Sequence, residues 1–129
     1  SRRQRQMCIR DSHQIEELSI KCAGRDQSVS QLSGGNKQKV VFGKWIGCGS
    51  EILILDCPTR GVDIGVKQAM YQLMVRLKNE GKSILMISEE LPELIGMSDR
   101  ILIMKNGEVS AEFERSETLS DAQIIEYMI

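Results

Sequence analysis

Two short stretches decide the fold of this chain, LSGGNKQKV at residues 32–40 and ILILD at residues 52–56. In the first stretch Ser33 is a good N-cap, and the apolar spacing behind it predicts a helix. Glycine in the first turn of a helix costs about 1 kcal/mol relative to alanine. The presence of Gly34 and Gly35 there indicates that something must approach the backbone closely.

This helix start has the chemistry of a phosphate-binding site. A serine hydroxyl and two amides without side chains lie at the positive end of a helix, and Lys37 and Lys39 follow in the next turns. A Cβ atom at either glycine would hold a phosphate away from the amides, and the Ser33 hydroxyl can donate to a phosphate oxygen. The alternative is a capped helix with a purely structural role.

The second stretch predicts a buried parallel strand, because its continuous apolar run ends abruptly at Asp56. Open parallel sheets bind ligands at the carboxyl ends of their strands, and an aspartate there typically holds Mg²⁺ for nucleotide phosphates. The alternative is that Asp56 simply ends a strand, and the glycine-rich helix start upstream argues against it.

The rest of the chain predicts an α/β fold. A strand, a helix and a second strand in succession imply a parallel crossover, and Asn106-Gly107 between apolar runs predicts a hairpin with a type I′ turn. A capping box at residues 120–123 predicts a terminal helix. The further expected elements are helices at 14–21, at 34–46, between the cap Asp63 and Gly81, and at 92–95, and strands at 83–87, 100–104 and 108–113.

Composition narrows the classes of function. The 129 residues are 41% hydrophobic and 27% charged, which is typical of a small soluble domain or part of a larger one. A net charge of −1 argues against a nucleic-acid partner.

No apolar run approaches the ~20 residues of a membrane-spanning helix, and no signal-peptide core follows the basic N-terminus, so we expect a cytosolic protein. Without a Cys-x-x-Cys pair, the four cysteines should be free thiols rather than metal ligands.

These residues resemble the ATP-binding subunits of ABC transporters. Residues 32–38 are similar to the ABC signature motif, residues 52–56 to the Walker B strand and residues 60–63 to the D-loop. Three longer segments are more specific: LSGGNKQKV at 32–40, PTRGVDIG at 58–65 and ELPE at 90–93. They resemble the second, C-terminal ATPase half of two-cassette proteins that energise import of ribose, galactose, xylose and related sugars. The resemblance covers roughly Ile15 to the C-terminus.

The resemblance implies part of a P-loop NTPase fold, with ATP and Mg²⁺ as cofactors. It leaves residues 1–13 as an unassigned arm and makes residues 14–129 the C-terminal part of one cassette. Asp56 would hold Mg²⁺ through the nucleotide. The implied signature residues are Leu32, Ser33, Gly34, Gly35, Asn36 and Gln38, and the D-loop residues are Arg60, Gly61, Val62 and Asp63.

Three departures from the family pattern matter. No Gly-x-x-x-x-Gly-Lys-Ser/Thr phosphate loop occurs in the chain, and the adenine-stacking aromatic and Q-loop that the family places upstream should be absent too. Cys57 stands where the family has the glutamate that polarises the attacking water, and a thiol is a poor substitute for that carboxylate. Glu89 stands at the position of the switch histidine, where its charge would repel the γ-phosphate. We therefore expect the ATP site built on this chain's own Walker B strand to be weak or inactive. We also expect the isolated chain not to hydrolyse ATP.

Because the family's two ATP sites are composite, the resemblance implies that this chain's signature serves the ATP of a partner cassette, which is the first half of the same protein, a second subunit, or both. It further implies a membrane permease as partner, a place on the cytoplasmic face of the inner membrane, and only indirect contact with sugar. Two alternatives remain. One is a non-hydrolytic regulatory or interaction module, and the other is a chromosome-maintenance ATPase, for which the expected coiled-coil heptads or basic surface do not appear.

Overall fold

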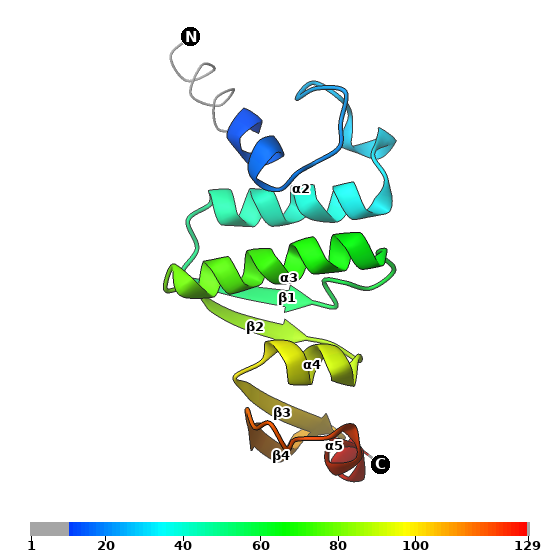
Figure 1. Cartoon of the computed structure of the whole chain (residues 1–129), viewed down its shortest axis with the longest axis vertical. Coiled ribbons are helices and arrows are strands. Elements are labelled where there is room, and N and C mark those ends of the chain that lie inside the picture. The colour runs from blue at the N-terminus through cyan, green and yellow to red at the C-terminus, as the bar shows by residue number, and fades with distance from the viewer. Residues whose placement is uncertain (1–10, 129) are drawn as a thin grey trace. The chain divides into compact units, whose positions relative to one another are not determined.

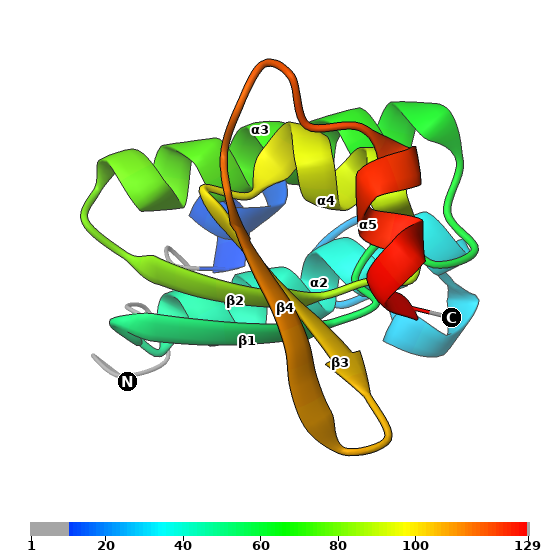
Figure 2. The same cartoon turned by 90° about the horizontal axis from the view of Figure 1, so that it is seen from below.

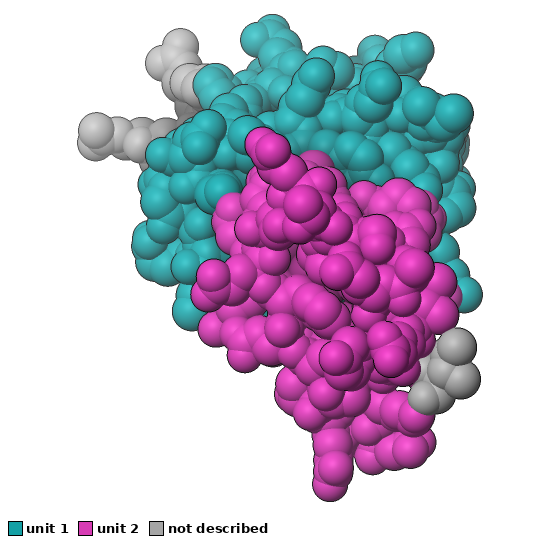
Figure 3. All heavy atoms as spheres, turned by 60° about the horizontal axis from the view of Figure 1, so that its bottom comes forward, with its two compact units in different colours: residues 1–87 teal, residues 88–129 magenta. Residues whose placement is uncertain are grey.

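The structure is a computed structural model that describes residues 11–128. The chain divides into two compact units, Ser1–Ile87 and Ser88–Ile129 (Figure 3). Most of the arm expected at residues 1–13, and with it Cys8, lies outside the described residues. Within residues 11–128, no helix is long and apolar enough to cross a membrane.

The first unit is built around two parallel strands. β1 (Ile52–Asp56) pairs in parallel with β2 (Ser83–Ile87), and α3 (Ile64–Asn79) connects them and packs against β2 (Figure 1). This confirms the predicted strand, helix and strand. The first unit also contains η1 (Val29–Gln31) and α2 (Gly34–Gly47).

The core of the first unit follows the predicted periodicity of α3. Its apolar face is buried, and the helix lies along one side of the two strands (Figure 2). Asp63 caps its first turn, where its carboxylate accepts a hydrogen bond from the Val66 amide at 3.0 Å. The buried apolar side chains of this unit are Leu18, Leu32, Phe42, Leu53, Leu55, Met70, Leu73, Met74 and Leu77.

The first helix ends earlier than predicted. Residues 11–17 are helical, whereas the sequence pattern placed a helix at 14–21. Ser19 takes a positive φ of 49°, and the amides of Ser19 and Ile20 donate to the carbonyls of Glu16 and Ile15, which closes the helix. The prediction was wrong here because a serine occupies the left-handed position in which glycine is the usual signal.

The second unit contains α4 (Leu91–Met97), β3 (Arg100–Lys105), β4 (Glu108–Glu114) and α5 (Asp121–Met128). Asn106 and Gly107 have φ values of 52° and 82°, which confirms the two positive φ angles expected of the hairpin turn. Ile101, Ile103 and Ile124 form the core where α5 packs on the hairpin.

Two details complete the second unit. The Gln123 side chain accepts a hydrogen bond from the Ser120 amide at 2.9 Å, which is one of the two bonds of the predicted capping box. The second bond differs from the prediction, because the Gln123 amide donates to the Ser120 carbonyl at 3.2 Å rather than to the Ser120 hydroxyl. The strand register shifts between Ile103 and Met104, so Ser110 has no direct partner on β3. Its hydroxyl donates to the carbonyl of Ile103 at 3.2 Å, which partly replaces the interrupted ladder.

Candidate functional site

The glycine-rich start of α2 is fixed by side-chain hydrogen bonds. Ser33 is the N-cap, and its hydroxyl oxygen accepts from the Asn36 amide at 3.5 Å and from the Asn36 side-chain nitrogen at 2.8 Å. The Asn36 side-chain oxygen accepts from the backbone amide of Lys21 at 2.9 Å. Asn36 therefore holds both the Ser33 hydroxyl and the preceding loop, and this positioning role was not evident in the sequence.

The two glycines of this turn have different surroundings. A Cβ atom on Gly34 would meet nothing within 4 Å, whereas one on Gly35 would lie 2.7 Å from Cγ2 of Val66 in α3. Gly35 is therefore required for packing inside the protein. Only Gly34 leaves the open space that a phosphate group would need.

The helix start fits a phosphate group. The first amides of a helix have no partner inside the helix, and the described residues contain no hydrogen bond from the Gly34 or Gly35 amide. Ser33 and Gly34 are exposed, and the Ser33 hydroxyl can still donate its proton, because both of its hydrogen bonds within the chain are accepted by the oxygen. The exposed end of the helix thus offers an array of donors to an anion.

The remaining residues of the predicted signature motif differ in exposure from Ser33 and Gly34. Leu32 is buried and anchors the strand-like entry to the helix, and Gln38 is partly buried one turn further on. Neither residue is as exposed as Ser33 and Gly34.

The predicted Walker B aspartate lies at the carboxyl end of β1. Asp56 is exposed, and the following residue, Cys57, adopts a positive φ of 44°. The Cys57 amide donates to the Ile87 carbonyl at 2.9 Å, and the Arg60 amide donates to the Cys57 carbonyl at 3.1 Å. These bonds turn the chain sharply after Asp56 and leave its carboxylate at the end of the strand.

The predicted D-loop leads directly into α3. Arg60 and Gly61 are exposed, and Gly61 has a φ of 71°, a left-handed conformation that glycine adopts without strain. Val62 is partly buried, and Asp63 is occupied as the cap of α3. Val66 in the first turn of α3 lies against the Gly35 position, so the first turns of α2 and α3 are packed together.

The second unit carries the switch position. Glu89 follows the end of β2 and is exposed. Its neighbour Ser88 donates a short hydrogen bond to the Glu93 carboxylate, and the Glu90 amide donates to Ser88 Oγ at 3.1 Å. Glu93 is buried. The hydrogen bond between Ser88 and Glu93 therefore fixes this loop, whereas Glu89 projects from it into solvent. In the sequence, only the family-like segment ELPE at residues 90–93 drew attention to Glu93.

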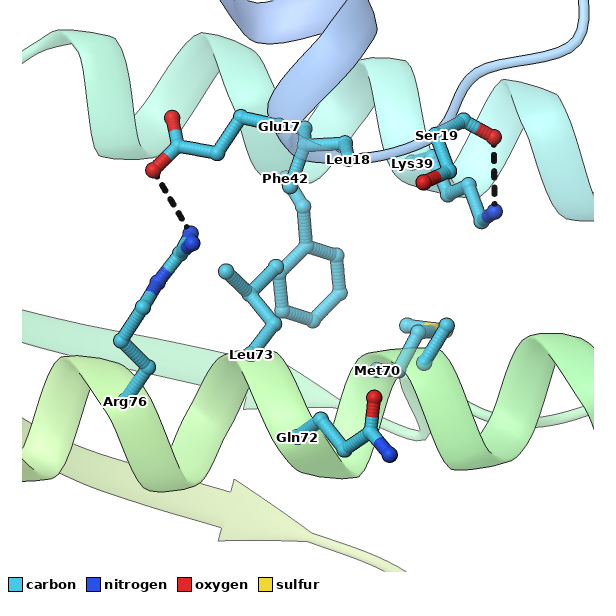
Figure 4. Close-up of a pocket in the computed structure, with 10 residues that line it drawn as sticks. Glu17, Leu18, Ser19, Lys39, Phe42, Met70, Gln72, Leu73 and Arg76 are labelled. Atoms are coloured by element: carbon cyan, nitrogen blue, oxygen red, sulfur yellow. Dashed lines mark hydrogen bonds and ion pairs between the residues drawn. The ribbon is translucent and has the colours of Figure 1, made fainter.

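A cavity of about 230 Å³ lies elsewhere in the first unit (Figure 4). Phe42, Met70 and Leu73 contribute apolar side chains to it. At its rim Glu17 and Arg76 form an ion pair at 2.9 Å, and Lys39 donates to the Ser19 carbonyl at 3.0 Å. Of the residues predicted to bind phosphate, Lys39 alone lines this cavity, and the charged groups at its rim already have partners within the chain.

Within residues 11–128, no three His, Cys, Asp or Glu residues cluster in a way that could hold a metal ion. Cys22, Cys48 and Cys57 are not joined in disulfide bonds among the described residues.

The chain is similar to several curated bacterial proteins. No known family profile matches it. It is 48% identical over 103 residues to the ribose import ATP-binding protein RbsA of Clostridium perfringens, and 52% identical over 103 residues to that of Streptococcus agalactiae. Each match covers 80% of this chain and 21% of the relative, so the chain spans about a fifth of the length of these proteins.

Solved structures show the same fold. An ATP-binding cassette of an ABC transporter, MJ1267, aligns with a TM-score of 0.80 and 25% identity over 95% of this chain and 49% of that chain. The dimeric structure of a post-hydrolysis state of the cassette MJ0796, bound to ADP and Pi, aligns with a TM-score of 0.72 and 22% identity over 82% of this chain and 46% of that chain.

Proposed function

Since the chain belongs to the ABC ATPases and is a homologue of the ribose import ATP-binding proteins, we propose that it forms part of an ATP-binding subunit that energises ribose import. Residues 14–129 would be the C-terminal part of one cassette. The subunit would lie on the cytoplasmic face of the membrane, bind a permease and a partner cassette, and contact sugar only indirectly. The proposal includes no nucleic-acid partner.

The observation that carries the proposal is the capped, open start of α2. Ser33 and the amides of Gly34 and Gly35 would contact the γ-phosphate of ATP held by the partner cassette. Donors fixed before the reaction stabilise the charge that develops on a transferring phosphoryl group, because they need no reorganisation. Asn36 would act as a positioning residue for the Ser33 hydroxyl.

The chain's own Walker B end would form a weaker half-site. Asp56 would hold Mg²⁺ through the nucleotide, and the ion would neutralise phosphate charge when bound. Cys57 provides no carboxylate to orient the attacking water, and the exposed Glu89 would bring a negative charge toward the phosphates. Hydrolysis would therefore occur mainly at the site that this chain's signature completes.

Cys57 and Glu89 also favour a second function, a regulatory module that keeps the ABC fold without catalysing hydrolysis. In that case the signature would contribute nothing to turnover. The two functions can be separated by substituting Ser33.

The test uses a chimera in which this chain replaces the matched region of the Clostridium perfringens relative, assembled with its permease. Ser33→Ala should lower ribose-stimulated ATP hydrolysis by about a hundredfold, because loss of one preorganised donor typically has that effect. Ser116→Ala removes a hydroxyl that bonds only to neighbouring Thr118 and is the matched control. Unchanged turnover in Ser33→Ala would favour the regulatory module and contradict the proposal.

A further inference from the structure

The first turn of α2 rests against the side chain of Val66 in α3. A Cβ atom on Gly35 would lie 2.7 Å from Cγ2 and 3.2 Å from Cγ1 of Val66, so both methyl groups face the turn. On the neighbouring residue, a Cβ atom of Gly34 would meet nothing within 4 Å, and Ser33 is exposed. The turn is therefore in contact with α3 at Gly35 and open at Ser33 and Gly34.

Val66 is itself held in place. Its amide donates to the Asp63 carboxylate at 3.0 Å in the first turn of α3. Valine in a helix has one strongly preferred χ1 rotamer, so its two methyl groups cannot easily turn away from Gly35. Val66 also begins the stripe of α3 that continues one and two turns later in the buried residues Met70 and Leu73.

α2 is also held near its other end. A Cβ atom on Gly43 would lie 2.9 Å from Cδ1 of Leu18, which directly follows the first helix. Because α2 is one continuous helix of 14 residues, the contacts at Gly35 and Gly43 set its position together. Loss of the contact at Gly35 would therefore let the first turn shift while the end near Gly43 stays in place.

We infer that Val66 is a positioning residue for ATP hydrolysis. Its side chain would set how far the Ser33 hydroxyl and the Gly34 amide reach toward the γ-phosphate of ATP in the partner cassette. The inference rests on the proposed function, which supplies that phosphate. Asn36 orients the Ser33 hydroxyl through a hydrogen bond of 2.8 Å, whereas Val66 places the turn as a whole. Such placement matters, because a displacement of about 1 Å can lower a rate about a hundredfold.

The test measures ribose-stimulated ATP hydrolysis of the chimera at varied ATP concentration. Val66→Ala removes both methyl groups beside Gly35 and should lower kcat about tenfold, because the turn is then free to leave its productive position. KM for ATP should stay within about twofold, because the signature turn acts in the transition state rather than in the first binding of nucleotide. Val66→Ile keeps both γ carbons and the stiff rotamer, so its kcat should stay within about twofold of the parent.

Val75→Ala is the matched control. It removes the same two methyl groups from α3, at a residue that is 48% exposed, and should change kcat less than about twofold. Gly35→Ala tests the contact from the other helix and should lower kcat about tenfold, because its Cβ pushes the turn away from Val66. The double variant Gly35→Ala/Val66→Ala should regain at least about threefold of that loss, because the new methyl group fills the space of the old ones. A purely structural role would give no such recovery once turnover is corrected for the amount of assembled complex.

Nuclear magnetic resonance of the 129-residue chain gives a second readout, without nucleotide. In Val66→Ala, the backbone amide signals of Gly34 and Gly35 should shift or broaden relative to the parent, whereas those of Gly96 and Gly107 in the second unit should not. Circular dichroism checks that the variant folds. Unchanged signals at Gly34 and Gly35 would overturn the inference.

Failure of this inference differs from failure of the proposed function. Parental kcat in Val66→Ala, together with severe loss in Ser33→Ala, would refute only the positioning role. An equal loss of kcat in Val66→Ala and Val75→Ala would refute it as well. Parental turnover in Ser33→Ala would refute the proposed function and, with it, the positioning role.

Discussion

Val66 occupies the space that a side chain on residue 35 would need, with its Cγ2 atom 2.7 Å from the position of a Cβ on Gly35. This contact joins the first turn of α2 to the first turn of α3. Asp63 fixes the first turn of α3 by accepting a hydrogen bond from the Val66 amide. The glycine-rich first turn of α2 is therefore packed against the first turn of α3 at Gly35, while the space beside Gly34 remains open.

Alanine substitutions at the two adjacent glycines should have opposite effects on stability. Gly35→Ala should lower the free energy of unfolding by about 1–2 kcal/mol, because overpacking against Val66 exceeds the helix propensity that alanine gains. Gly34→Ala should leave it unchanged or raise it by up to about 1 kcal/mol. Urea denaturation of the chain measures both values.

The double variant Gly35→Ala/Val66→Ala tests the cause. Removal of the two Val66 methyl groups makes room for the new Cβ, so the double variant should lose less stability than the sum of the two single variants. Strict additivity would show that the contact does not account for the loss.

The hairpin turn of the second unit should depend on its glycine. Gly107 has a φ of 82°, so Gly107→Ala should lower stability by about 1–2 kcal/mol, the cost of a left-handed conformation for a residue with a Cβ. Gly96→Ala is the control, because Gly96 lies within α4 with open space around it and alanine favours helix by up to about 1 kcal/mol. Hydrogen exchange of the amides in β3 and β4 measures the change. Equal protection in the two variants would contradict the strain assigned to the turn.

The parts of the fold that the sequence predicted correctly are those set by residues close together in the chain. The Asn-Gly turn, the apolar strand that ends at Asp56 and the periodic face of α3 each depend on neighbouring residues, and the structure confirms them. The end of the first helix was missed because Ser19 takes a conformation that serine rarely adopts.

The site shows where sequence patterns stop being informative. The pattern indicated that something approaches the glycine pair, but only the tertiary structure shows that Val66 lies against Gly35 and leaves Gly34 open. The hydrogen bonds from Lys21 to Asn36 and from Asn36 to Ser33 join residues whose partnership depends on how the loop folds back. Buried Glu93 was likewise missed, because its burial depends on the packing of α4.

Cys57 should be strained by its backbone conformation. Its φ of 44° is left-handed, so Cys57→Gly should be more stable than Cys57→Ala by about 1 kcal/mol. The comparison between the two variants removes the effect of losing the thiol, since both lose it. Thermal denaturation of the two proteins measures the difference. A more stable alanine variant would contradict the strain.

The isolated chain should not bind Mg-ATP tightly, because it contains no phosphate loop to hold the α- and β-phosphates. Isothermal titration calorimetry should show no binding in the micromolar range. The full-length Clostridium perfringens relative, titrated in the same buffer, is the positive control. Micromolar affinity or steady phosphate release from the isolated chain would show that it contains a phosphate site of its own.

In the full-length chimera, Cys57→Ala should leave ribose-stimulated ATP hydrolysis within about twofold of the parent, because the position already lacks the carboxylate that would polarise water. The division of labour between the half-sites then predicts opposite sensitivities, a severe loss in Ser33→Ala and almost none in Cys57→Ala. Steady-state turnover of the two chimeras in vesicles, each corrected for the amount of assembled complex, provides the comparison. If Cys57→Ala abolished turnover while Ser33→Ala retained it, the working site would be the one built on this chain's own Walker B strand.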